Sequence, residues 1–269
     1  MKTIQIIRRL SRSFNWQFVV KIISVVVSYV HSLDWCDKEL CPNGGKHIAC
    51  KNSGGFHKRC EPDVEIIDLR PYRDLILHEH NNRRNFVAQG LLPGYYPAAR
   101  MATLQWDDEL EFLAELNVRT CVVDHDECRN SYRFQNIGQN LVGIAHYKHE
   151  PQNITAILLK DIFLWYTEHK IIDSSFITSF KVTRDFEKYG HFAEFVLERN
   201  THVGCSMIRY TYPKNRDLYI YNLACDYASV YAYDAPVYAA GKPGSGCKTG
   251  TNRKYPSLCS TREVYNPNY

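Results

Sequence analysis

The stretch YGHFAEFVLERNTHVGCSM places His191 and Glu194 three residues apart at the start of a helix-like run. This spacing puts two side chains on neighbouring turns of a helix, where they suit a metal site or a base with its orienting acid. With about 100° of rotation per residue, however, Phe192 and Phe195 define an apolar stripe that leaves Glu194 on the far side of His191. We therefore expect Glu194 to face solvent. His191 is expected at the border of the apolar face, without Glu194 as its partner.

Two further positions carry side chains capable of chemistry. His125 lies in DHDEC among three acids, a setting that fits a solvated turn as well as a functional histidine. Glu168 ends a stripe of apolar residues that also contains Asp161, on a helix predicted over 154–170. Because a buried or half-buried acid needs a partner, Glu168 is the more informative of the two sites.

Sequence motifs of common hydrolases are missing. The chain has neither a GxSxG elbow nor an HExxH helix. A serine hydrolase needs a nucleophile beside a base, and the sequence offers no evident nucleophile. This favours a non-enzymatic protein.

Cysteine usage indicates an oxidising compartment. Ten cysteines occur without a CxxC pair, so a disulfide framework is favoured over a zinc ribbon or a thioredoxin-like site. Residues 1–32 contain five basic residues and no acid, then an apolar stretch over 22–30, as in a secretory signal peptide. An uncleaved anchor is the alternative, although the apolar stretch is short for a membrane span. The sequon at Asn153 predicts N-glycosylation of a secreted chain.

The charge balance gives no support to nucleic-acid binding. The whole chain has a net charge of +4, from 33 Lys and Arg against 29 Asp and Glu. Removing the five basic residues of the leader leaves 28 against 29, so the remaining chain is close to neutral.

Periodicity and turn residues predict an α+β chain. Residues 33–62 show no period and are expected to form loops tied by disulfides. Helices are predicted from Pro71 to Gly90, over 107–121, over 154–170 and from His191. Two β-rich runs, THVGCSMIRYTYP and DLYIYNLACDYAS, predict a hairpin.

The register of this hairpin indicates a disulfide. If the hairpin is centred on Asn215, Cys205 lies opposite Cys225 and the two can bridge. In the Pro- and Gly-rich tail from Pro236, we expect Cys247 and Cys259 to close a small loop of their own.

The motifs together resemble the CAP superfamily, which comprises cysteine-rich secretory proteins, antigen-five venom allergens and plant pathogenesis-related proteins of group one. The resemblance is strongest to the insect antigen-five branch and covers about residues 36–230. It is carried, in family order, by CPNGGKHIAC, EHNNRRNFVAQG, MATLQWDDELEFLAELNVRTC, HDECRN, IGQNL, WYTEH, GHFAEFV, VGCSMIRY and YNLACDYA. It implies an α-β-α sandwich with an antiparallel sheet.

The resemblance also implies a shallow cleft formed by His125, Gln139, Glu168 and His191. Gln139 departs from the pattern of many members, which have Glu in GEN, and this removes a negative charge. Two imidazoles can bind zinc or copper, but with two protein ligands we expect weak, adventitious binding and no required cofactor.

In the family, EHN anchors the first helix, so we expect a structural role and no metal cluster for residues 78–80.

The disulfide pairing implied by the resemblance leaves one extra pair in the tail. The tail lacks the many cysteines of the toxin-type C-terminal domain, so ion-channel blocking is not supported. The pairs are Cys36–Cys50, Cys41–Cys128, Cys60–Cys121 and Cys205–Cys225, with Cys247–Cys259 left over.

These observations predict a secreted, monomeric binding protein without a membrane span in its mature chain. Its partner would be an extracellular protein or a lipid or sterol. The alternative is a metal-dependent hydrolase or protease that uses His125, His191 and Glu168. The expected segments are a signal peptide (1–32), a Cys-rich loop segment (33–65), the CAP domain (66–235) and a C-terminal extension (236–269).

Overall fold

A computed structural model describes residues 34–181 and 189–266 of the chain. The second of two compact units, Cys36–Tyr269, contains all the helices and strands named below. The predicted signal peptide lies outside the described residues. Within the described ranges, no helix combines the length and apolar character that crossing a membrane requires.

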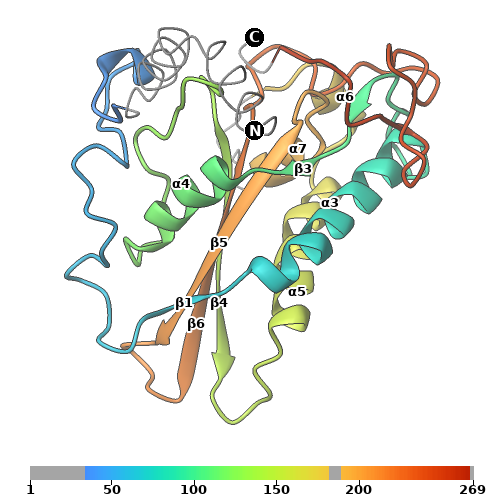
Figure 1. The fold of residues 1–269 in the computed structure, drawn as a ribbon. Coiled ribbons are helices and arrows are strands. Elements are labelled where there is room, and N and C mark those ends of the chain that lie inside the picture. The colour runs from blue at the N-terminus through green and yellow to red at the C-terminus, as the bar shows by residue number, and fades with distance from the viewer. Residues whose placement is uncertain (1–33, 182–188, 267–269) are drawn as a thin grey trace, which may run out of the picture. The chain divides into compact units, whose positions relative to one another are not determined.

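The unit is built around an antiparallel sheet with the spatial order β1-β5-β6-β4. The strands are β1 (Glu65–Ile67), β4 (Gly138–Tyr147), β5 (His202–Thr211) and β6 (Leu218–Tyr227), and β3 (Gln105–Trp106) pairs in parallel with β5. Helix α4 covers one face, and α3 and α5 lie on the other (Figure 1). The helices are α3 (Arg73–Ala88), α4 (Asp108–Val118), α5 (Ile154–Thr167) and α7 (Gly190–Val196), which packs against α3, α5 and β4. This arrangement confirms the expected α-β-α sandwich.

The predicted hairpin is formed by β5 and β6. Its register places Cys205 opposite Cys225, and these two residues form a disulfide. Gly204, beside this disulfide, allows α4 to approach the sheet closely, because a Cβ at this position would lie 2.1 Å from the backbone nitrogen of Glu111. The small residue thus sets the spacing between the sheet and α4.

Side-chain caps mark the starts of α4 and α5. Asp107 caps α4 by accepting from the backbone of Glu109 and Leu110, and Asn153 caps α5 by accepting from Ala156. Helix α5 ends at Thr167, and the predicted continuation forms a 3-10 turn, η3 (Glu168–Lys170). The remaining short helices are η1 (Lys38–Leu40), η2 (Arg70–Tyr72) and α6 (Ser174–Thr178).

Strand β4 was not predicted from the sequence. Its first four residues are buried and only its second half alternates between half-buried and exposed positions, so the sequence lacks a clear period of two. Two glycines, Gly138 and Gly143, further weaken the strand signal.

Five disulfides join the ten cysteines, and all five are the pairs named above. The Cys247–Cys259 disulfide closes a small loop in the tail, as expected, and this loop is packed onto the rest of the domain. Strand β7 (Leu258–Cys259) pairs with β2 (Met101–Ala102), and Leu258 is part of the main core. The Glu263 carboxylate accepts from Arg100 at 2.7 Å. The tail is therefore packed onto the domain, while the proposed segment boundaries remain predictions.

The Arg84 side chain joins three parts of the domain. It is fully buried on α3 and donates to the carbonyl oxygens of Ala102, Phe195 and Leu197 at 2.8–3.0 Å, with a longer contact of 3.4 Å to Asn200. Burial lowers the pKa of Arg84 to about 10, so the guanidinium stays charged at neutral pH. These bonds hold the end of α7 and the end of β2 against α3.

We predict that Arg84→Met strongly destabilises the domain. The substitution leaves buried carbonyls without donors and should reduce the free energy of unfolding by at least about 3 kcal/mol. The control is Arg83→Met on the same helix, whose partly exposed ion pair with Glu79 should contribute about 1 kcal/mol. Urea unfolding with the disulfides intact measures both values. Equal losses in the two variants would contradict the role assigned to Arg84.

Our expectation for Glu194 was wrong, since this side chain is only 1% exposed. Helix α7 is covered on the side that the helical wheel assigned to solvent. One carboxylate oxygen of Glu194 accepts from Asn200 Nδ2 at 2.6 Å, and a Cβ on Gly138 would lie 2.3 Å from the same oxygen. Burial raises the pKa of Glu194 to about 8.

We predict that Glu194 makes the stability of the domain fall as pH rises. Between the ordinary pKa of 4.5 and about 8, the unfolded chain releases a proton that the folded chain retains. Glu194→Gln should remove this loss, so its free energy of unfolding relative to the parent should increase from pH 5 to pH 8, by an amount on the order of a few kcal/mol. Urea unfolding across this range is the measurement, with the exposed Glu150→Gln as control. Parallel pH profiles of Glu194→Gln and the parent would refute the prediction.

Candidate functional site

The four residues expected in the cleft come from four separate segments. His125 lies in the exposed loop after α4, and Gln139 is the second residue of β4. Glu168 follows α5 directly, and His191 is the second residue of α7. The structure joins them into two hydrogen-bonded pairs, His191–Glu168 and His125–Gln139.

Glu168 holds His191 in one orientation. Its Oε1 lies 2.6 Å from His191 Nδ1, and its Oε2 accepts the backbone N–H of Phe192 at 3.0 Å. The carboxylate therefore also caps the first turn of α7. Trp165 stacks near the imidazole with a centroid distance of 6.2 Å. Because Nδ1 donates to Glu168, Nε2 of the neutral ring carries the free lone pair.

Gln139 orients the ring of His125, as Glu168 orients the ring of His191. Gln139 Nε2 donates to Asp226 at 2.9 Å and to Asp126 at 3.1 Å, so its Oε1 is left to accept from His125 Nδ1 at 2.8 Å. The His125 ring therefore also presents its Nε2 lone pair. The same network buries Asp226, whose pKa is raised well above its usual value by burial.

The two imidazoles lie close enough to interact electrostatically. Desolvation lowers the pKa of His125, and the positive charge of a protonated His191 lowers it further. A neutral histidine is the form that binds metal, so two nitrogen donors are available here. Among the described residues, no group of three or more His, Cys, Asp or Glu is arranged to hold a metal ion.

His125 lines a pocket of about 500 Å³ between the loop after α4 and the Cys-rich segment. One wall is acidic, with Asp124, Asp126 and Glu127. Lys46, His57 and Arg59 from the Cys-rich segment also line the pocket, and the Lys46 backbone N–H donates to Glu127 Oε2 at 2.7 Å. The sequence did not indicate a role for these three residues in a pocket.

Two carboxylates of the site were missed from the sequence. Asp126 is next to His125 and contacts Gln139, while Asp226 reaches Gln139 from the neighbouring strand. The β4–β6 register pairs Gln139 directly with Asp226. Assigning β4 as a strand would have revealed this pair.

The 78–80 cluster is structural, as expected. His80 is fully buried, with Nδ1 at 2.8 Å from the carbonyl oxygen of Ile76 and Nε2 at 2.9 Å from the Tyr227 hydroxyl. Burial lowers the pKa of His80 to about 4. His78 contacts the Tyr255 hydroxyl, and Glu79 pairs with Arg83.

Comparisons with known proteins agree with this architecture. A sequence profile of the Cysteine-rich secretory protein family (CAP) matches residues 77–227. "Venom allergen-1" of Aedes aegypti is 36% identical over 251 residues, covering 92% of this chain and 94% of the relative. "Antigen 5 like allergen Cul n 1" of Culicoides nubeculosus is 39% identical over 207 residues, covering 72% of this chain and 93% of the relative.

A solved structure titled "Crystal structure of NaASP2 with Zn2+" shares the fold at a TM-score of 0.56 and 20% identity, covering 75% of this chain and all of that chain. The fold, the disulfides and the sequence matches lead to one assignment. The chain belongs to the cysteine-rich secretory protein (CAP) family, in its branch of antigen-five and venom-allergen proteins.

Proposed function

We propose that this chain is a secreted protein that acts by binding and not by catalysis. Membership of the CAP family supports this, because its relatives include allergens and antigen-five proteins. Five disulfides fit an extracellular location. Asn153, the site proposed for glycosylation, is exposed, and its Oδ1 caps α5.

A groove between α3 and α5 carries the proposal of a lipid ligand. The groove measures about 490 Å³, and Phe86, Leu92 and Tyr166 supply its apolar lining. Beside it on α5, Phe163 and Leu164 are 45% and 40% exposed, which extends the apolar surface. The remaining lining residues are polar or charged and comprise Asn82, Arg83, Asn85, Gln89 and His169.

This composition suits an amphipathic ligand. An acyl chain or sterol ring can cover the aromatic side chains, and a polar head group can reach the Arg83 guanidinium. We therefore favour a fatty acid or sterol over a protein partner at this groove.

We predict that Phe86→Ser weakens lipid binding at least about fivefold, because it removes a large apolar contact from the groove. The matched control is Phe112→Ser on α4, since Phe112 is 42% exposed and Phe86 is 40% exposed, and the two lie on opposite layers. Titration with a fluorescent fatty acid and with a fluorescent sterol measures the affinity of each variant. Failure of the parent protein to bind either probe would contradict the lipid proposal.

We further propose that His125 and His191 bind zinc weakly and without an enzymatic role. The two Nε2 lone pairs support binding, and the lack of a third ligand in the described cleft supports its weakness. No described hydrogen bond joins either imidazole to a hydroxyl group, and all ten cysteines are in disulfides. The His125–Gln139 and His191–Glu168 pairs therefore lack the activated nucleophile that covalent hydrolysis needs.

We predict that replacing both His125 and His191 by Ala lowers zinc affinity at least about tenfold. The exposed His149→Ala serves as control and should bind zinc as the parent does. Calorimetric titration with zinc measures binding. The same proteins, with and without zinc, are then tested on peptide and ester libraries. Zinc-dependent turnover that disappears in His191→Ala would refute the non-enzymatic proposal and support the hydrolase alternative.

A further inference from the structure

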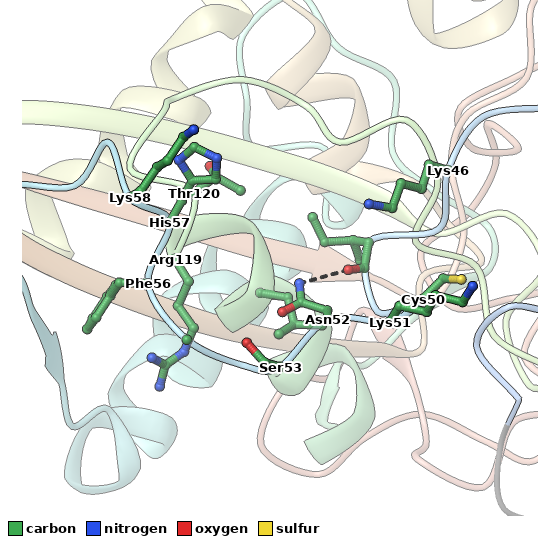
Figure 2. Close-up of a pocket in the computed structure, with 13 residues that line it drawn as sticks. Lys46, Cys50, Lys51, Asn52, Ser53, Phe56, His57, Lys58, Arg119 and Thr120 are labelled. Carbon is green, nitrogen blue, oxygen red and sulfur yellow. Dashed lines mark hydrogen bonds between the residues drawn. The ribbon is translucent and has the colours of Figure 1, made fainter.

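A further pocket, of about 380 Å³, lies between the Cys-rich segment and the end of α4, next to the pocket that contains His125 (Figure 2). We call it the basic pocket, because its lining includes several basic side chains and no Asp or Glu. This contrasts with the near-neutral charge of the chain after the leader. Its polar and charged lining consists of Lys46, Lys51, Asn52, Ser53, His57, Lys58, Arg119 and Thr120.

Three of these positive charges are available to a ligand. The side chains of Lys46, Lys51 and Lys58 belong to exposed residues, and no ion pair involves them within the described part of the chain. Arg119 differs, since its guanidinium donates to Glu115 at 2.6 Å and lies over the Phe56 ring. The lysines therefore supply the uncompensated charge.

His57 adds an oriented donor to the pocket. Its Nδ1 accepts from Arg59 Nε at 2.9 Å and from the Arg59 backbone nitrogen at 3.2 Å. Nε2 of the ring therefore carries the hydrogen and is available to donate. Together with the hydroxyl groups of Ser53 and Thr120, this gives a set of donors that matches oxyanion oxygens.

The two walls of the basic pocket are fixed in place. Cys60–Cys121 joins the Cys-rich segment to the chain just after α4, and Cys36–Cys50 ties the loop at the other end. The backbone N–H of His57 also donates to the carbonyl of Arg119 at 2.9 Å. Little ordering of the backbone is then needed on binding, which favours affinity.

We propose that the basic pocket binds a soluble ligand that carries two or more sulfate or phosphate groups. Lys46 and Lys58 lie at opposite ends of the pocket in Figure 2, an arrangement that suits a ligand with more than one anionic group. A concave site of this volume suits a small molecule better than the flat surface of a membrane. The pocket lies on the α4 layer, opposite the groove between α3 and α5, so it is independent of the proposed lipid ligand.

The test compares a triple variant with a charge-matched control. The variant carries Lys46→Gln, Lys51→Asn and Lys58→Gln. Asparagine is chosen at position 51 because Lys51 has a φ of +53°, a conformation that Asn tolerates. The control carries Lys214→Gln, Lys242→Gln and Lys248→Gln, three exposed positions outside the pocket. Circular dichroism melting checks that both proteins are folded.

Calorimetric titration uses two probes, a sulfated disaccharide and inositol hexakisphosphate, at about 0.15 M salt. We expect the parent to bind at least one probe, the pocket variant to lose tenfold or more in affinity, and the control to stay within twofold. The probe that binds shows whether the pocket takes a sulfated or a phosphorylated ligand. The proposal is overturned if the parent binds neither probe or if both triple variants lose affinity equally.

Discussion

The buried Arg84 guanidinium is the constraint on which the site depends. It has no carboxylate within ion-pair distance among the described residues, and it is held by carbonyl oxygens from three segments. Such a charge is tolerated only when its donors are satisfied, so the chain around it has little freedom to move. Two of the carbonyls belong to residues 195 and 197 at the end of α7. The helix that carries His191 is thereby fixed against α3.

A second constraint is the burial of acidic side chains close to Gln139 and on the helix that carries His191. Glu194 and Asp226 are both buried, and the pKa of each is raised by burial. Gln139 connects this region to His125 through an uncharged amide. A carboxylate at position 139 would place a further negative charge beside Asp226 and Asp126. The amide instead orients His125 without adding charge, which suits a binding site more than acid–base cycling.

Local sequence patterns predicted the main helices and the β5–β6 hairpin. Features that depend on tertiary packing, namely strand β4 and the burial of Glu194, were missed. Periodicity and caps identified the main helices. The hairpin register identified Cys205–Cys225, because these two residues are direct partners in the β5–β6 pairing. Three further disulfides, Cys36–Cys50, Cys41–Cys128 and Cys60–Cys121, and the cleft positions depended on the family resemblance. Strand β4 was missed because its first four residues are all buried, which removes the alternation from that part of the strand. Glu194 was misplaced because a helical wheel cannot show that other segments cover both sides of a short helix.

The Cys-rich segment does more than stabilise the domain by cross-linking. Its residues 46–58 form a shared wall, since Lys46, Asn52 and His57 line both the basic pocket and the pocket that contains His125. The pocket that contains His125 is also lined by Asp124, Asp126 and Glu127, so acidic and basic side chains share the lining of that pocket. An anionic ligand is attracted to the lysine side and repelled from the acidic side. The disulfide-held loop therefore supplies the basic side chains of this surface, next to the pocket that contains His125.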